Sequence, residues 1–162
     1  MNTLPDEWNL YYHDPNDTNY AEESYINLLT IKTANDFWDI FEVIKKEKWT
    51  TGMFFLMRKG YRPLWDAPEN AKGGIWTKKV DGSESYDIFL DCMIHVLAEK
   101  LLKQNNDCIV GVSISPKTNG NAHFHILKYW NKGTTTTEWQ SFNPSLKMKL
   151  GKDIAWKANT AR

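Results

Sequence analysis

An aromatic residue followed directly by an acid occurs in the polar loop Pro63-Leu64-Trp65-Asp66. A tryptophan on such a loop is badly placed for a core, but its flat ring can stack on a nucleic-acid base. The carboxylate of Asp66 can accept two hydrogen bonds, and guanine offers N1–H and N2–H₂ together, whereas adenine cannot present both donors. A methylated, cationic guanine would gain further through cation–π attraction. The alternative from this tetrapeptide alone places Trp65 at the edge of a core and Asp66 in a turn.

A second pattern, His123-Phe124-His125, invites a metal site, because alternate strand residues point to one face. Zinc needs further ligands at matching spacing, and the other histidines, His13 and His95, fall in a different strand and on a helix. Surface polar residues, or a phosphate contact by His123, are the other interpretations. No phosphate-binding loop, nucleophile elbow, zinc-protease helix or Cys-x-x-Cys motif occurs. We therefore expect no metal, no cofactor and no catalytic residue.

The composition predicts one globular domain over residues 1–162. Hydrophobic residues make up 41% and charged residues 25% of the chain, close to the average for soluble domains. No apolar run is long enough for a membrane span, and the start of the sequence is polar and acidic, so we expect a cytosolic or nuclear protein and choose a cytoplasmic location. The two cysteines are unpatterned, as in a reducing compartment.

Two features of the composition depart from the ordinary and favour a surface that faces a ligand or partner. The chain has eight tryptophans and 14% aromatic residues, which is more ring surface than its core requires. The net charge of zero hides an asymmetry, because residues 1–23 carry six acids and no Lys or Arg, while residues 108–162 carry eight Lys or Arg and two acids. The basic third is the better place for an anion.

The chain reads as several strands joined mainly by short turns, with two long helices between them. Thr33 and Asp36 have the spacing of a capping box at the start of the first helix. This pattern predicts an α+β fold with an antiparallel sheet and helices packed on one face. We expect strands at 8–13, 25–31, 53–57, 75–80, 109–115, 122–130 and 154–156, helices at 34–47 and 85–104, and loops at 60–74 and 116–121.

The second predicted helix has two apolar stripes, which suggests two contacts. Phe89, Met93 and Val96 form the first stripe, and the second contains Leu90, Ile94, Leu97 and Leu101. One stripe can face the sheet while the other makes a second contact. The alternative is that a neighbouring loop covers the second stripe.

Several anchored motifs together resemble the translation initiation factor 4E family, the proteins that bind the messenger-RNA cap. Their order and spacing match those of the family over roughly residues 4–130, with a weaker match at 154–160. The motifs are Trp8, Asn35-Asp36-Phe37-Trp38, Pro63-Leu64-Trp65-Asp66, Gly73-Gly74-Ile75-Trp76 and the segment from Asp87 to Glu99. The resemblance implies a curved antiparallel sheet, two to three helices on its convex back, and a cap slot between two aromatic rings on the concave side.

The resemblance also assigns roles in the slot. Trp65 matches the second stacking ring, and Asp66 occupies the place of the guanine-reading Glu. Tyr20 is our choice for the first ring, and Tyr25 is the alternative. In the family a further tryptophan contacts the methyl group of the cap. Three positions of this sequence compete for its place, which are Leu127, Tyr129 and Trp130.

For the phosphates of the cap, Lys117 matches the first of the family's two basic residues. His123 falls nearest to the second, and Lys128 is the alternative if the register differs. Ile75 stands where many relatives carry a further basic residue, so we expect weaker binding of the triphosphate.

On the convex back, the resemblance implies a site for a helical peptide of a 4G-type scaffold or a 4E-binding repressor. Trp38, Leu90, Asp91 and Ile94 occupy the matching positions. The segment 142–151 is short and Lys-rich where the family has a third helix, so we expect that side of the slot to be remodelled. Capped messenger RNA and such a peptide are the expected partners, and the chain is expected to be a monomer without catalysis. The alternatives are an enzyme acting on capped or modified nucleotides, and a cap-binding repressor.

Overall fold

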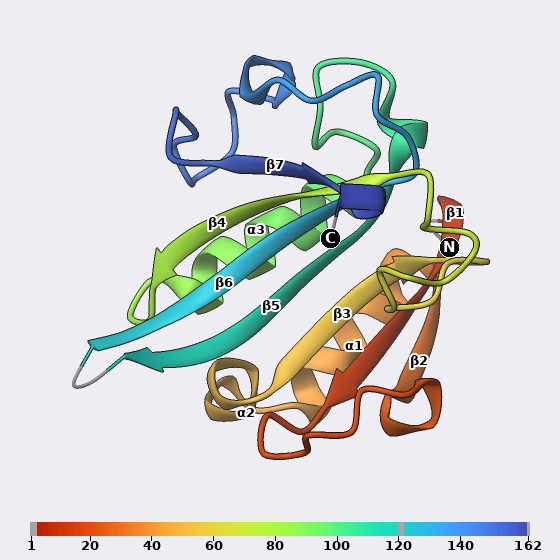
Figure 1. Ribbon diagram of the computed structural model, residues 1–162. Coiled ribbons are helices and arrows are strands. Elements are labelled where there is room, and N and C mark those ends of the chain that lie inside the picture. The colour runs from red at the N-terminus through yellow and green to blue at the C-terminus, as the bar shows by residue number, and fades with distance from the viewer. Residues whose placement is uncertain (1–2, 120–121, 162) are drawn as a thin grey trace.

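The computed structural model describes residues 3–119 and 122–161. Within these residues, seven strands form one antiparallel sheet in the order β2-β1-β3-β5-β6-β4-β7. The predicted α+β class with a curved antiparallel sheet is confirmed, and the helices lie behind the sheet, on its convex side (Figure 1). The strands are β1 (Thr3–His13), β2 (Ile26–Thr33), β3 (Met53–Arg58), β4 (Gly74–Asp81), β5 (Ile109–Asn119), β6 (Ala122–Asn131) and β7 (Ala155–Ala158).

Three α-helices and four short 3-10 turns connect these strands. None of the helices in the described part of the chain is long and apolar enough to cross a membrane. The helices are α1 (Ala34–Val43), α2 (Lys46–Thr51) and α3 (Ser85–Leu97), and the 3-10 turns are η1 (Glu22–Ser24), η2 (Asn106–Cys108), η3 (Trp139–Ser141) and η4 (Asn159–Ala161).

Alternation along the strands creates two apolar clusters, one on each face of the sheet. The larger cluster packs between the sheet and the helices, and Trp8, Trp49 and Trp76 are buried in it. The smaller cluster lies on the concave face and includes Met53, Phe55, Met57, Ile75, Val110 and Trp130. The concave face is therefore apolar at its centre, where a ligand site can have an aromatic floor.

The first helix begins as predicted but ends early. Thr33 caps it by accepting a hydrogen bond from the Asp36 amide, and the Asp36 carboxylate accepts one from the Thr33 amide, which confirms the capping box. The predicted single helix over 34–47 is wrong, because Ile44 and Lys45 have extended backbones and α2 begins afresh at Lys46. The indole of Trp49 donates to the Ile44 carbonyl, 3.2 Å away, and this contact fixes the bend.

The second helix is also shorter than the predicted 85–104. It ends at Leu97, and Glu99 has a left-handed backbone with φ of 56°. The carboxylate of Glu99 accepts two hydrogen bonds from the buried Arg58 guanidinium, at 2.8 and 3.1 Å. Leu101 is buried from a non-helical segment, so it does not continue the second apolar stripe of the helix.

The hairpin of β5 and β6 is longer than predicted. Residues 116–119 continue β5 where we expected a loop, and Pro116 pairs with His125 and Lys117 with Phe124. β3 pairs with β5 only as far as Ile114, so beyond it the other edge of β5 makes no pair with β3. A proline, which lacks an N–H, is tolerated at such an edge.

Candidate functional site

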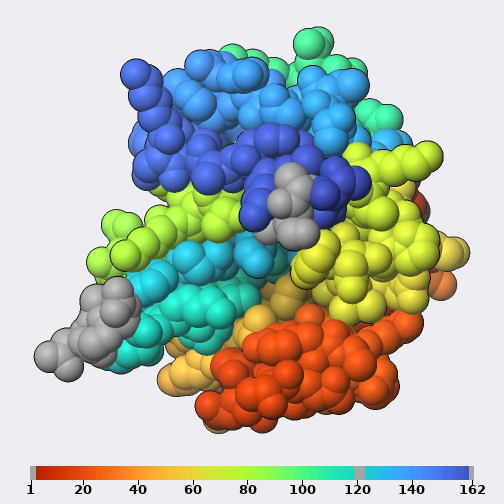
Figure 2. Space-filling view, viewed as in Figure 1, coloured from red at the N-terminus to blue at the C-terminus, as the bar shows by residue number. Residues whose placement is uncertain are grey.

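A cavity of about 490 Å³ opens on the concave face of the sheet, beside the loop that carries Trp65. Four strands and two loops form it, and in Figure 2 the yellow residues 60–73 and the orange-red residues 14–25 border this face. Its lining residues are Tyr20, Tyr25, Met53, Phe55, Pro63, Leu64, Trp65, Asp66, Thr77, Ser115, Lys117, Ile126, Lys128 and Trp130. The structure thus brings Tyr20, Trp65, Asp66 and Lys117 together, as the sequence predicted, although their roles stay predictions.

Trp65 lies at the tip of a tight turn, where its ring is 43% exposed. The turn is closed by the Ala67 amide, which donates to the Leu64 carbonyl at 3.1 Å. The buried amide of Asn70 donates to the carbonyls of Arg62 and Leu64, each at 2.8 Å, so it holds both sides of the turn. The ring and the neighbouring exposed Asp66 are therefore presented by a fixed backbone.

Asn159 anchors this loop to the end of the chain. Its side-chain amide donates to the Asn70 carbonyl at 2.7 Å, and its backbone amide donates to the Gly73 carbonyl at 2.9 Å. A side chain at Gly73 would collide with the Asn131 carbonyl, which explains a glycine at this position. Sequence reasoning did not find Asn70 or Asn159, because their contacts are long-range and polar, with no local pattern.

An ion-pair network joins the two loops that carry the pocket rings. The Arg62 guanidinium donates to both carboxylate oxygens of Glu69, at 2.8 and 2.9 Å, and to Glu22 at 3.0 Å. These bonds to Arg62 lower the pKa of Glu69 to about 2, so its carboxylate is charged at neutral pH. Glu22 lies two residues after Tyr20, and Arg62 lies three residues before Trp65. Arg62 therefore sets the distance between the two loops.

Tyr20 and Tyr25 both face the cavity, in different ways. Tyr20 is 52% exposed, and one face of its ring is stacked on the imidazole of His13. Tyr25 is half-buried and meets Phe55 edge to face, with the ring centroids 5.3 Å apart. Burial raises the pKa of Tyr25 to about 12, and the charges of Tyr20 and Asp66 add to the rise. Its hydroxyl group therefore remains a hydrogen-bond donor near neutral pH.

Trp130 is the candidate for a methyl contact that reaches the cavity. Its ring is 4% exposed and its indole N–H donates to the Ser113 hydroxyl at 3.1 Å. Leu127 and Tyr129 alternate with it along β6 and are fully buried in the cluster on the opposite face.

The structure does not bring His123 to the cavity. His123 pairs with Thr118, and Phe124 pairs with Lys117, so strand alternation points His123 to the face opposite Lys117. Lys128 lies on the same face as Lys117 and lines the cavity with it. Our expected register was wrong because the hairpin extends beyond Pro116. Within the described residues, no group of three or more His, Cys, Asp or Glu could hold a metal ion.

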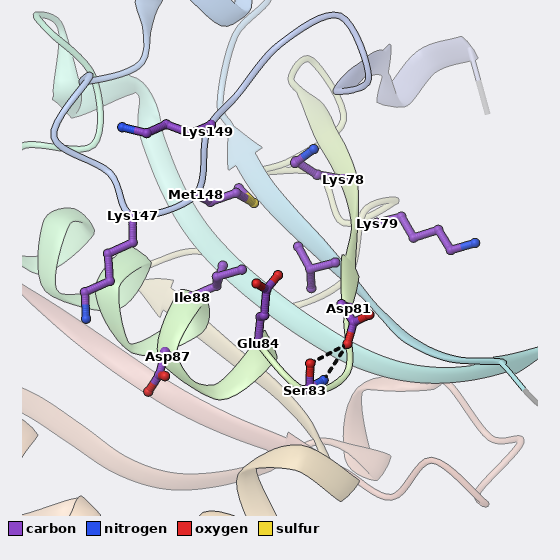
Figure 3. Close-up of a pocket in the computed structure, with 11 residues that line it drawn as sticks. Lys78, Lys79, Asp81, Ser83, Glu84, Asp87, Ile88, Lys147, Met148 and Lys149 are labelled. Carbon is purple, nitrogen blue, oxygen red and sulfur yellow. Dashed lines mark hydrogen bonds between the residues drawn. The ribbon is translucent and has the colours of Figure 1, made fainter.

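A second hollow, of about 520 Å³, lies between α3, the outer part of β4 and residues 147–149 (Figure 3). Lysines and acids alternate around it, including Lys78, Lys147, Asp81, Glu84 and Asp87. None of its described lining residues is aromatic, so it offers no ring for stacking on a base.

On the convex back, three of the four predicted contact residues are accessible. Trp38 on α1 is 50% exposed, Ile94 on α3 is 38% exposed and Leu90 is half-buried. The Asp91 side chain is only 11% exposed, and its carboxylate accepts a hydrogen bond from the Lys147 amide at 2.8 Å. The segment that follows Phe142 therefore already occupies this carboxylate.

Comparison with known proteins gives a match over nearly the whole chain. The family model described as Eukaryotic initiation factor 4E matches residues 3–161. An initiation factor 4E homolog of Acanthamoeba polyphaga mimivirus is 33% identical over 135 residues, which cover 69% of this chain and 50% of that protein. Initiation factor 4E of Candida glabrata is 28% identical over 153 residues, covering 90% of this chain and 72% of the relative. The chain spans half or less of the length of the first curated relatives that it matches.

Solved structures share the fold. C. elegans initiation factor 4E-3, in complex with the 4E-binding protein Mextli and a cap analog, superposes with a TM-score of 0.69 at 20% identity, covering 83% of this chain and 76% of that chain. Ascaris suum initiation factor 4E-3 with the m7G cap gives a TM-score of 0.68 at 20% identity, covering 83% and 75%.

Proposed function

Because the chain belongs to the eukaryotic initiation factor 4E family, we propose that it binds the 7-methylguanosine cap of messenger RNA in the cavity on its concave face. The observation that carries the proposal is the joint presence of two exposed rings, Tyr20 and Trp65, and the carboxylate of Asp66 around one cavity. A methylated guanine offers a flat cation for the rings and two N–H donors for the carboxylate. We also propose that residues 1–162 form one cap-binding domain.

In this proposal the base stacks between Tyr20 and Trp65. Asp66 accepts hydrogen bonds from N1–H and N2–H₂ of guanine, and Trp130 at the floor of the cavity contacts the methyl group. Each stacked ring contributes on the order of 1–3 kcal/mol of binding free energy. The Arg62 network supports this arrangement, because it links the two loops that carry the rings.

For the phosphates, we propose Lys117 and Lys128 in place of Lys117 and His123. Both lysines line the cavity and come from neighbouring strands of the hairpin. Two lysine side chains at the cavity attract the negative charge of a triphosphate. Strand alternation points His123 to the other face, and His123 does not line the cavity.

On the convex back, we propose a second site that takes an amphipathic helical peptide of a 4G-type scaffold or a 4E-binding protein. Trp38 and Ile94 supply the exposed apolar surface, and Leu90 lies beside Ile94 at helical spacing. The match to the family's peptide site is incomplete, because the Asp91 carboxylate already accepts a hydrogen bond from the Lys147 amide. We propose that the role of the chain is binding and recruitment, in the cytoplasm, without catalysis.

The test compares 7-methyl-GTP with GTP by quenching of the intrinsic tryptophan fluorescence. We expect selective binding of 7-methyl-GTP by the wild type, a roughly 10- to 100-fold loss in Trp65→Ala, and a similar loss in Asp66→Ala. Trp38→Ala is the matched control, because it removes a half-exposed tryptophan from the opposite face. If Trp65→Ala and Asp66→Ala bind 7-methyl-GTP like the wild type, the cavity is not the cap site. Chromatography of 7-methyl-GTP after incubation with the protein should show no conversion.

A further inference from the structure

One aromatic ring on the concave face is explained neither by the core nor by the cap cavity. Among the described residues, Phe124 belongs to neither apolar cluster and does not line the cavity, although its side chain is only half-buried on β6. The ammonium group of Lys79 lies over this ring, 4.1 Å from its centroid. A ring and a cation side by side on an open sheet surface form the kind of platform that binds single-stranded nucleic acid.

The register places this pair directly beside the cavity. Phe124 is opposite Lys117 of β5, and Lys79 of β4 is opposite Ile126, whose side chain lines the cavity. In Figure 3 the Lys79 side chain leaves β4 away from Ile88 of α3 and from Glu84, the residue that precedes this helix, in agreement with a position on the concave face. The cavity and the pair are therefore one continuous surface.

Two further lysines extend this surface across the sheet. Lys128 is opposite Thr77 and one step diagonally from Lys79, and Lys157 of β7 is opposite Ile75 on the same face. Strands are about 4.8 Å apart and same-face neighbours along a strand about 6.7 Å apart, so Lys79 and Lys128 stand roughly 8 Å from each other. Lys79 and Lys128 are thus spaced closely enough for flexible side chains to reach consecutive phosphates.

The local charge is almost entirely positive. Lys79 and Lys157 are exposed, and no ion pair joins either of them to a carboxylate of the described residues. The acid on the same face of β4 is Asp81, and its carboxylate is turned back to the Ser83 amide and hydroxyl, at 2.8 and 2.7 Å. Three lysines and one engaged acid give this wing of the sheet an attraction for polyanions.

We propose that the concave wing formed by Lys79, Phe124, Lys128 and Lys157 binds the single-stranded RNA that follows the cap. Lys79 and Lys157 contact phosphodiester groups, and Phe124 stacks on a base near the cap. This inference rests on the proposed function, because the cap in the cavity is what delivers the RNA chain to the wing. It adds affinity without sequence preference, since every base has a face to stack and every nucleotide a phosphate.

The experiment uses three ligands: 7-methyl-GTP, a 7-methylguanosine-capped pentaribonucleotide, and the same pentaribonucleotide without a cap. Binding of the fluorescein-labelled oligonucleotides is followed by anisotropy between about 50 and about 200 mM salt, the range over which counterion release is resolved. 7-Methyl-GTP is followed by tryptophan quenching. The wild type should bind the capped oligonucleotide more tightly than 7-methyl-GTP, and with a steeper dependence on salt.

Variants of the wing residues test whether the additional affinity for the capped oligonucleotide comes from the wing. Lys79→Gln, Lys157→Gln and Phe124→Ala should each weaken the capped oligonucleotide several-fold and leave 7-methyl-GTP unchanged. Each lysine variant should also lower the slope of log affinity against log salt by about 0.7, the value for one single-strand phosphate contact. Lys32→Gln is the matched control, because Lys32 is an exposed lysine of β2 at the other edge of the sheet.

The outcomes separate the two proposals. The RNA wing is overturned if the capped oligonucleotide binds no better than 7-methyl-GTP, if Lys79→Gln weakens both ligands equally, or if Lys32→Gln has the same effect as Lys79→Gln. If the wild type does not bind 7-methyl-GTP, the cap proposal fails. Binding of the uncapped oligonucleotide at low salt, compared between the wild type and the lysine variants, then tests whether the wing binds RNA. Weaker binding by Lys79→Gln and Lys157→Gln would support it, and unchanged binding would overturn it.

Discussion

The ring of Tyr20 is stacked on the imidazole of His13, with centroids 4.7 Å apart and planes 9° from parallel. His13 is fully buried, and its Nε2 donates to the carbonyl of Asn19 at 2.7 Å, one residue before Tyr20. The imidazole is therefore fixed by the sheet and by the loop at once. It supports one face of the Tyr20 ring, while the ring keeps half of its surface exposed at the cavity.

This backing leads us to expect that Tyr20, and not Tyr25, is the first stacking ring. Tyr20→Ala should weaken 7-methyl-GTP binding by on the order of 1–3 kcal/mol, roughly 10- to 100-fold, and Tyr20→Phe should retain the affinity because the ring remains. Tryptophan quenching measures both. Tyr25→Phe is the control, and near wild-type binding by Tyr20→Ala together with a loss in Tyr25→Ala would reverse the assignment.

Sequence reasoning could place the cavity residues whose signals are local. Trp65 and Asp66 stand out because a ring and an acid share a polar loop. The sheet and its helices follow from alternation and helical spacing, which are also local patterns. These features were predicted because each depends on a few neighbouring residues.

The face of the hairpin on which a residue lies depends on a register that the sequence does not reveal. We expected Pro116 to end β5, yet it pairs with His125, and the longer hairpin decides which side chains reach the cavity. A shift of one residue moves every side chain to the other face. Lys128 therefore faces the cavity, and His123 faces away from it.

This register leads to an expectation for the phosphate contacts. Lys117→Gln and Lys128→Gln should each weaken 7-methyl-GTP binding several-fold, with a larger effect at low salt, because each removes one cation from the cavity. His123→Ala should bind like the wild type, because His123 lies on the other face. Tryptophan quenching at two salt concentrations checks the three variants. Weaker binding by His123→Ala alone would restore it to the phosphate site.

The Arg62 network predicts a pH dependence of stability. Arg62 lowers the pKa of Glu69 from 4.5 to about 2 in the folded chain, and no such partner is fixed in the unfolded chain. A lowered carboxyl pKa contributes stability that is fully present above about pH 4.5 and is lost as the pH falls towards about 2. Glu69→Gln should therefore lose less stability over this range than the wild type in urea unfolding. Parallel curves for the two proteins would show that the ion pair does not stabilise the fold.

The exposed tryptophan of α1 allows the two proposed sites to be separated. Trp38→Ala should lose at least about 2 kcal/mol of binding free energy for a helical 4G-type peptide, which is typical of a central interface tryptophan. Binding of 7-methyl-GTP should not change, because α1 covers the convex face and the cavity opens on the concave face. Calorimetry with both ligands tests this. Undiminished peptide binding by Trp38→Ala would remove this residue from the interface.

The hydrogen bond from the Lys147 amide to Asp91 sets a condition on the peptide site. The Asp91 carboxylate accepts this bond at 2.8 Å, and nearby His95 Nε2 lies 2.9 Å from the Ser145 hydroxyl, so residues 145–147 are held on α3. A partner that donates to Asp91 must first displace the Lys147 amide.

We therefore expect hydrogen exchange at the Lys147 amide to be slow in the free protein and faster in Asp91→Ala. Exchange at this amide should also be faster in the wild type when a helical peptide is bound. The Asn143 amide, which donates to the Leu101 carbonyl at 2.9 Å, is the internal control and should not change. Unchanged exchange at Lys147 in the peptide complex, measured by NMR, would mean that the partner leaves Asp91 to this segment and binds through Trp38 and Ile94 alone.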